Sequence, residues 1–205
     1  MPYPREKVAG TLFFIAAIQF VLGLTIAETL YPGYSMSGNY ISDLGIGPSS
    51  IIFNSSVFLL GLLLLIGTYF LRHFPDFRIV NTMLLLMALG AMGVGVFTKN
   101  YRTAHGAVAT TAFFFSGMSA ITSYKALKKP LSIISIILGA ITLAALALFS
   151  SGMITNGSLT SDIAYDSNFY LGLGAGGMEH MIVIPALMWL VMFSGHLATR
   201  QEMPQ

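Results

Sequence analysis

Four side chains that could carry acid–base chemistry lie near the ends of long apolar segments. Asp43 lies in a short polar segment after the first apolar segment, and His105 begins the fourth. Glu179 and His180 lie about one turn inside the sixth. Carboxylates and imidazoles act as general acids and bases, and they also bind zinc. Their spacing matches no motif such as H-E-x-x-H, so acid–base catalysis by these four residues and a divalent metal site both stay open.

A second set of polar residues could hold a substrate. Lys99 and Arg102 precede His105, and their charges suit a phosphate group or an oxyanion. The candidate substrate-binding residues are Tyr40, Ser42, Asn54, Lys99 and Arg102. Structural roles compete with these interpretations. Asp43 can close a turn through backbone hydrogen bonds, and Lys99 and Arg102 can extend along the helix to the membrane surface.

The composition indicates an integral membrane protein. Of the 205 residues, 55% are hydrophobic and 9% are charged, whereas a soluble domain carries about 25% charged residues. Such a chain cannot cover a globular surface with polar groups, so we expect membrane lipids to surround it. A formal charge of +2 gives no basis for nucleic-acid binding. The chain has no cysteine, which excludes disulfides and thiolate metal sites.

The apolar segments are continuous and long enough to cross a bilayer as helices. The sequence therefore predicts an all-α, polytopic six-helix bundle that forms one domain over residues 1–205. The expected spans are residues 8–29, 51–71, 80–97, 104–124, 131–149 and 175–197. A longer loop, residues 150–174, would carry Asp162 and Asp166, and Asn156–Gly157–Ser158 in it matches a glycosylation acceptor.

The basic residues predict the orientation in the membrane, because cytoplasmic loops are enriched in lysine and arginine. With six spans, one side carries eight basic residues and the other carries only Lys99 and Arg102. The eight are Arg5, Lys7, Arg72, Arg78, Lys125, Lys128, Lys129 and Arg200. We therefore expect both termini to be cytoplasmic and the protein to lie in the cell membrane. The candidate residues would then converge in an outward-facing polar pocket.

The polar segment also carries a family resemblance. Ser37–Gly45, with the sequence SGNYISDLG, and the following Ser55–Gly61 resemble the prokaryotic membrane family known as domain-of-unknown-function family 998. His105–Gly106 and Gly177–Pro185 are similar to the same family's pattern, and the resemblance covers essentially the whole chain. More distantly, the first loop resembles the Frag/DRAM/Sfk membrane proteins. The resemblance implies a six-helix fold and supplies no reaction, because a shared fold does not fix function.

The leading hypothesis is a membrane protein that binds or modifies lipid head groups, as a hydrolase or transferase would. Asp43 and Glu179 would act as acid, base or metal ligand. His105 and His180 would move protons or bind the metal, and Arg102 or Lys99 would hold a phosphate. A non-catalytic structural or accessory membrane subunit is the alternative. The partners considered are membrane lipids, a second copy of the chain in a homo-oligomer, or a membrane complex in which the chain is an accessory subunit. Haem-binding electron transfer is less favoured, because His73 and His196 lie at a turn and a helix end. A transporter is also less favoured, because no charge lies at mid-membrane.

Overall fold

The computed structural model describes residues 4–155 and 167–200, and the regular elements in this part of the chain are all helices. Four short 3-10 helices are η1 (Ile41–Gly45), η2 (Pro75–Phe77), η3 (Ser123–Lys125) and η4 (Asn168–Tyr170). The long helices are α1 (Arg5–Leu30), α2 (Ser50–Leu71), α3 (Arg78–Val96), α4 (Arg102–Thr122), α5 (Leu131–Thr155) and α6 (Gly174–Thr199).

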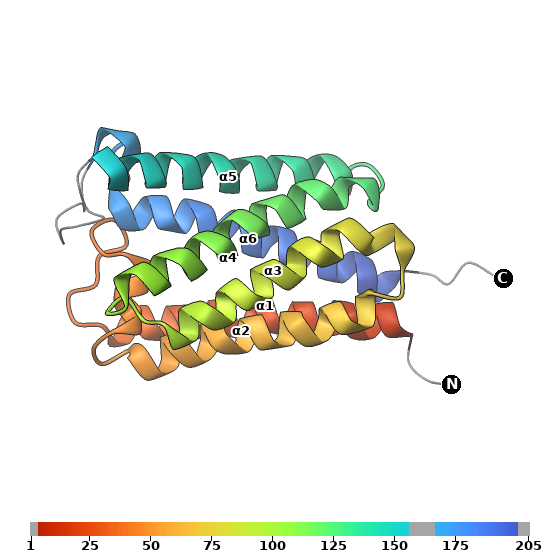
Figure 1. The fold of residues 1–205 in the computed structure, drawn as a ribbon, viewed down its shortest axis with the longest axis horizontal. Coiled ribbons are helices and arrows are strands. Elements are labelled where there is room, and N and C mark those ends of the chain that lie inside the picture. Colours follow the sequence, from red (N-terminus) through yellow and green to blue (C-terminus); the bar gives the residue numbers. More distant parts are fainter. Residues whose placement is uncertain (1–3, 156–166, 201–205) are drawn as a thin grey trace.

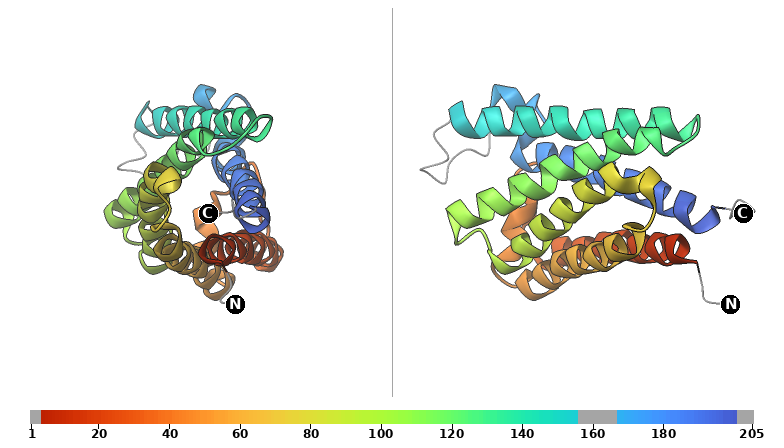
Figure 2. Two further views of the ribbon diagram at one scale, coloured as in Figure 1. Left: turned by 90° about the vertical axis from the view of Figure 1, so that its right-hand side faces the viewer. Right: turned by 45° about the vertical axis from the view of Figure 1, so that its right-hand side comes forward.

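The six long helices run alternately up and down and close into a ring. Each helix packs against its neighbours in the chain, and α6 returns to pack against α1. The two views of Figure 2 show this ring end-on and obliquely. Figure 1 shows that α1 begins and α6 ends at the same end of the bundle. The η1 segment and the α3–α4 turn lie at the other end, so the candidate residues share that end with the start of α6.

Glycines allow the helices to approach closely. A side chain at Gly61 of α2 would meet the carbonyl of Ala88 in α3, and one at Gly90 would meet the backbone of α4. Gly117 of α4 lies against Gly139 of α5, and a Cβ added at either glycine would contact the carbonyl oxygen of the other. Small residues at membrane helix contacts have this effect in general. The Gly117–Gly139 contact lies away from the η1 end, and Figure 1 shows α4 and α5 diverging from there toward η1.

Five helical segments in the described residues are long and apolar enough to cross a membrane, and these are α1, α2, residues 75–96, α5 and α6. Large apolar side chains also cover the outside of the bundle, with Ile51 80% and Leu22 59% exposed. Such a surface is typical of contact with lipid. Helix α4 is not among the five. Its sequence contains His105 and four threonines, so the sixth span predicted at residues 104–124 stays a prediction.

The helix bounds differ from the predicted spans mainly at α5. This helix continues to Thr155, whereas the sequence predicts a loop from residue 150. The prediction was wrong here because Ser150, Ser151 and Gly152 favour turns, but Gly152 packs against the ring of Tyr170. Asp162, Asp166 and the triplet Asn156–Gly157–Ser158 lie outside the described residues.

Candidate functional site

Asp43 holds the η1 segment in place. It is 3% exposed, and its Oδ2 accepts a hydrogen bond of 3.0 Å from the backbone N–H of Tyr40. Its Oδ1 forms an ion pair with Lys99. The Lys99 ammonium also lies 4.5 Å from the centre of the Tyr40 ring, a distance suited to a cation–π contact. Asp43 therefore joins the first loop to the α3–α4 turn.

Helix α6 holds the same segment from the other side. The backbone N–H of Ile41 donates to Glu179 Oε2 at 2.6 Å, and the N–H of Gly176 donates to the Ser37 carbonyl at 3.1 Å. A side chain at Gly176 would overlap the carbonyl oxygen of Asn39. This position therefore requires glycine, because the loop backbone lies directly on the first turns of α6.

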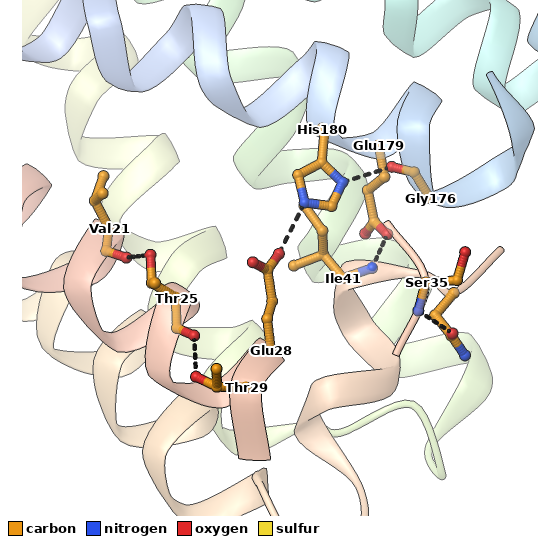
Figure 3. Close-up of polar contacts among 10 residues, drawn as sticks. Val21, Thr25, Glu28, Thr29, Ser35, Ile41, Gly176, Glu179 and His180 are labelled. Atoms are coloured by element: carbon orange, nitrogen blue, oxygen red, sulfur yellow. Dashed lines mark hydrogen bonds and ion pairs between the residues drawn. The ribbon is translucent and has the colours of Figure 1, made fainter. Parts of the chain in front are cut away.

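His180 lies on a different side of α6 and contacts α1. Its Nδ1 lies 2.7 Å from the Gly176 carbonyl, and its Nε2 lies 3.0 Å from Glu28 Oε1. Figure 3 shows the imidazole between these two groups, with Glu179 turned toward Ile41. A carbonyl can only accept, so Nδ1 donates. The Nε2–Glu28 contact therefore needs one proton, carried either by the imidazole or by the carboxyl group.

Tyr34 adds a phenol to this end of the bundle. Its oxygen is buried without a hydrogen-bond partner in the described residues. Burial raises the pKa of the Tyr34 phenol, and the nearby carboxylates of Glu28, Glu179 and Asp43 raise it further. The phenol therefore stays protonated, and it is a potential donor to a neighbouring carboxylate or to a bound molecule.

A cavity of about 710 Å³ lies between α4 and α5 at this end of the bundle. Its polar end is formed by η1, the α3–α4 turn, the start of α4 and one residue of α6. Its other walls are formed by apolar faces of α4 and α5. The polar lining residues at that end are Tyr40, Ser42, Lys99, Arg102, Thr103, His105 and Glu179. The main apolar lining residues are Phe113, Leu146, Phe149, Met153 and Ile154.

The cavity extends along α4 from its charged end. Along α4 it is lined from Thr103 to Phe113, a distance of about 15 Å at 1.5 Å per residue. That length is about half of a bilayer's hydrocarbon core. The charged groups lie at the η1 end, beside Met153 and Ile154 from the end of α5, whereas Phe113 of α4 and Leu146 of α5 line the deeper part.

His105 has one ring nitrogen without a hydrogen-bond partner among residues 4–155 and 167–200. Its Nδ1 lies 2.8 Å from the Phe97 carbonyl, so Nδ1 carries a proton and donates. In the neutral imidazole, Nε2 then holds a lone pair. The ring lines the cavity and also a smaller apolar chamber of about 70 Å³ inside the bundle. His105 could therefore accept a proton from a molecule in the cavity.

The structure separates the predicted residues into two groups. Of the four predicted catalytic residues, His105 and Glu179 line the cavity, as do Tyr40, Ser42, Lys99 and Arg102. Asp43 and His180 are not among the residues that line it. Asn54 also lies apart, where its Nδ2 donates to the Gly45 carbonyl at 3.0 Å and so packs α2 against η1. The structure thus gives these three residues contacts that support the loop.

The described residues do not assemble a metal site from protein groups alone, because no three His, Asp or Glu side chains among them lie close enough to hold an ion. His180 is also poorly placed to be an axial ligand of a haem. Both ring nitrogens of His180 already contact other groups, so this histidine does not offer a free axial ligand.

Several lining residues are absent from the sequence-based set of candidates. On α4 they include Thr103, Thr110 and Phe113, and on α5 they include Phe149 and Met153. Their spacing of three to seven residues marks one face of each helix. The same spacing occurs on faces that pack against other helices, so the sequence alone does not distinguish the cavity face.

One of three comparisons with known proteins finds a match. The model of the family described as "Protein of unknown function (DUF998)" matches residues 14–196. No curated protein and no solved structure matches the chain. The distant similarity of the first loop to Frag/DRAM/Sfk proteins has no support from these comparisons.

Proposed function

The chain belongs to the DUF998 family, and we propose that it is a multi-pass protein of the cell membrane that binds the head group of a membrane lipid. We infer six crossings, with α4 as the sixth, and both termini in the cytoplasm. The excess of lysine and arginine at the end of the bundle where α1 begins and α6 ends supports this orientation. The cavity between α4 and α5 then opens in the outer half of the bilayer.

The observation that carries the proposal is the division of the cavity into a charged end and an apolar remainder. Lys99 and Arg102 lie at the charged end, and Phe113 and Leu146 lie along the walls. Buried ionisable groups in membrane proteins normally face a wet cavity or pair with one another. A phosphate at the charged end would meet the two cations, while the attached apolar chains would lie between α4 and α5.

Lipid cross-linking would test this proposal. Purified protein in lipid nanodiscs would be irradiated with a phospholipid that carries a diazirine near the glycerol, and the labelled peptides would be mapped by mass spectrometry. We expect saturable labelling of residues 103–113 and 146–154, suppressed by excess unlabelled phospholipid. Labelling confined to outward-facing positions such as Ile51, which is 80% exposed, would contradict the proposal.

The same cavity supports a reaction on the bound head group. His105 Nε2 would accept the proton of a water or alcohol whose oxygen attacks the phosphorus, while Arg102 holds the phosphate. The bond from phosphorus to the head-group oxygen would break, and His105 would return the proton to that leaving oxygen. General-base catalysis of this kind contributes about 10²–10⁴-fold to a rate. We therefore expect His105→Ala to lower head-group turnover at least about 100-fold while lipid labelling of the cavity persists. Chromatography of lipids extracted from the nanodiscs would measure the turnover.

A non-catalytic accessory protein is the second candidate. It is favoured by the contacts of Asp43, His180 and Asn54, each of which holds backbone or a partner side chain at the η1 end. On this account the wild-type protein would show no turnover of any lipid, and His105→Ala would behave as wild type. Turnover by the wild-type protein that disappears in His105→Ala would exclude it.

A further inference from the structure

Glu179 presents a buried carboxylate oxygen to the cavity. The side chain is 5% exposed and lines the cavity. Its Oε2 accepts the Ile41 N–H at 2.6 Å, and its other carboxylate oxygen has no hydrogen-bond donor in the described part of the chain. Burying a carboxylate costs free energy unless a partner pairs with it. The vacant oxygen is therefore placed to accept a hydrogen bond from a molecule in the cavity.

Lys99, a cation that lines the same cavity, already has partners in the protein. Lys99 pairs with Asp43, which does not line the cavity, and contacts the ring of Tyr40, which does. Arg102 also lines the cavity and is exposed, whereas Glu179 is buried. The polar end thus carries a positive outer part, formed by Arg102 and Lys99, and a negative inner part, formed by Glu179.

This arrangement of charges matches a zwitterionic head group. We propose that the cavity selects phospholipids whose head group carries a primary ammonium, with the phosphate at Arg102 and Lys99 and the ammonium at Glu179. The inference rests on the lipid-binding function proposed above. A primary ammonium has three N–H donors, so it can donate to the vacant oxygen and neutralise the carboxylate. A trimethylammonium has no N–H, and a glycerol head group has no positive charge.

Competition between lipids would test this selectivity. Wild-type protein in nanodiscs would be labelled with the photoreactive phospholipid, and phosphatidylethanolamine, phosphatidylcholine or phosphatidylglycerol would be added as competitor. We expect phosphatidylethanolamine to compete at least about tenfold more strongly than the other two, a difference of about 1.4 kcal/mol in binding free energy, because only its head group both carries a positive charge and has N–H donors. Free phosphoethanolamine, which lacks the chains, should compete far less than the lipid. If it competes equally, the ligand is a soluble phosphoethanolamine rather than a lipid.

Substitution of Glu179 would connect the selectivity to this carboxylate. Glu179→Gln keeps an oxygen that can accept the Ile41 N–H, so the loop should stay attached while the negative charge is lost. We expect this variant to bind the three lipids equally, with phosphatidylglycerol unchanged from wild type. Glu28→Gln is the matched control, because Glu28 contacts His180 and is not among the lining residues of the cavity. It should keep the wild-type preference.

Two results would overturn the inference while leaving the proposed function in place. One is equal competition by all three lipids in the wild-type protein. The other is an unchanged preference for phosphatidylethanolamine in Glu179→Gln. Absence of any saturable labelling in the cavity would instead contradict the proposed function itself, so the two failures are distinguishable.

Discussion

Replacing Gly176 with valine should destabilise the end of the bundle that carries the cavity. The new side chain would overlap the backbone carbonyls of Met36 and Asn39. The loop would have to move away from α6, which would break the Gly176–Ser37 and Ile41–Glu179 hydrogen bonds. Overpacking at a rigid contact and the loss of buried hydrogen bonds together should cost about 3 kcal/mol. Thermal unfolding in detergent would measure the loss.

Gly195→Val is the matched control for this substitution. Gly195 lies in the same helix, and a side chain there would meet nothing within 4 Å. We expect the control to unfold at the wild-type temperature. The Gly176→Val protein should also be cleaved more rapidly by protease in the segment of residues 35–45. Equal unfolding temperatures and equal cleavage of the two variants would show that the loop is not held on α6 in this way.

The positions of the helices could largely be predicted from the sequence, because each apolar segment is long and interrupted by turn-forming or charged residues. Helix α4 is the one long helix in the described part of the chain that is not among the candidate membrane spans. It lines the cavity with His105, Thr103 and Thr110, and these polar residues lower its hydropathy. The residues that define the candidate site are therefore the same ones that weaken the hydrophobic signal of the helix.

The grouping of the candidate residues at one end also follows from the sequence, but the roles within the group do not. Asp43 and Glu179 are both buried carboxylates, and only the structure shows that Asp43 pairs with Lys99 while Glu179 lines the cavity. Such pairings depend on contacts between residues 56 and 138 positions apart. Sequence patterns do not show which residues so far apart in the chain come into contact.

Neighbouring residues on α6 illustrate the same limit. Glu179 and His180 are about 100° apart around the helix, so the sequence predicts that they point in different directions. It does not predict which of them faces the cavity. The structure turns His180 toward Glu28 of α1, 152 positions away in the chain, and leaves Glu179 at the cavity.

Filling the cavity with a large side chain should abolish lipid binding. Gly106 lines the polar end of the cavity, and a side chain there would meet nothing within 4 Å. Gly106→Trp should therefore fold normally and place its indole in the space proposed for the head group. Gly195→Trp introduces the same residue at an equally open position outside the cavity lining, and it should bind lipid as the wild-type protein does.

Native mass spectrometry of the three proteins, released from nanodiscs, tests the central claim most directly. We expect the wild-type protein and Gly195→Trp to retain a bound phospholipid after release. Gly106→Trp should retain at least about tenfold less, a difference of about 1.4 kcal/mol in binding free energy. Thermal unfolding of Gly106→Trp at the wild-type temperature would establish that the variant is folded. Equal lipid retention by all three proteins would contradict the account of the cavity as a lipid-binding site.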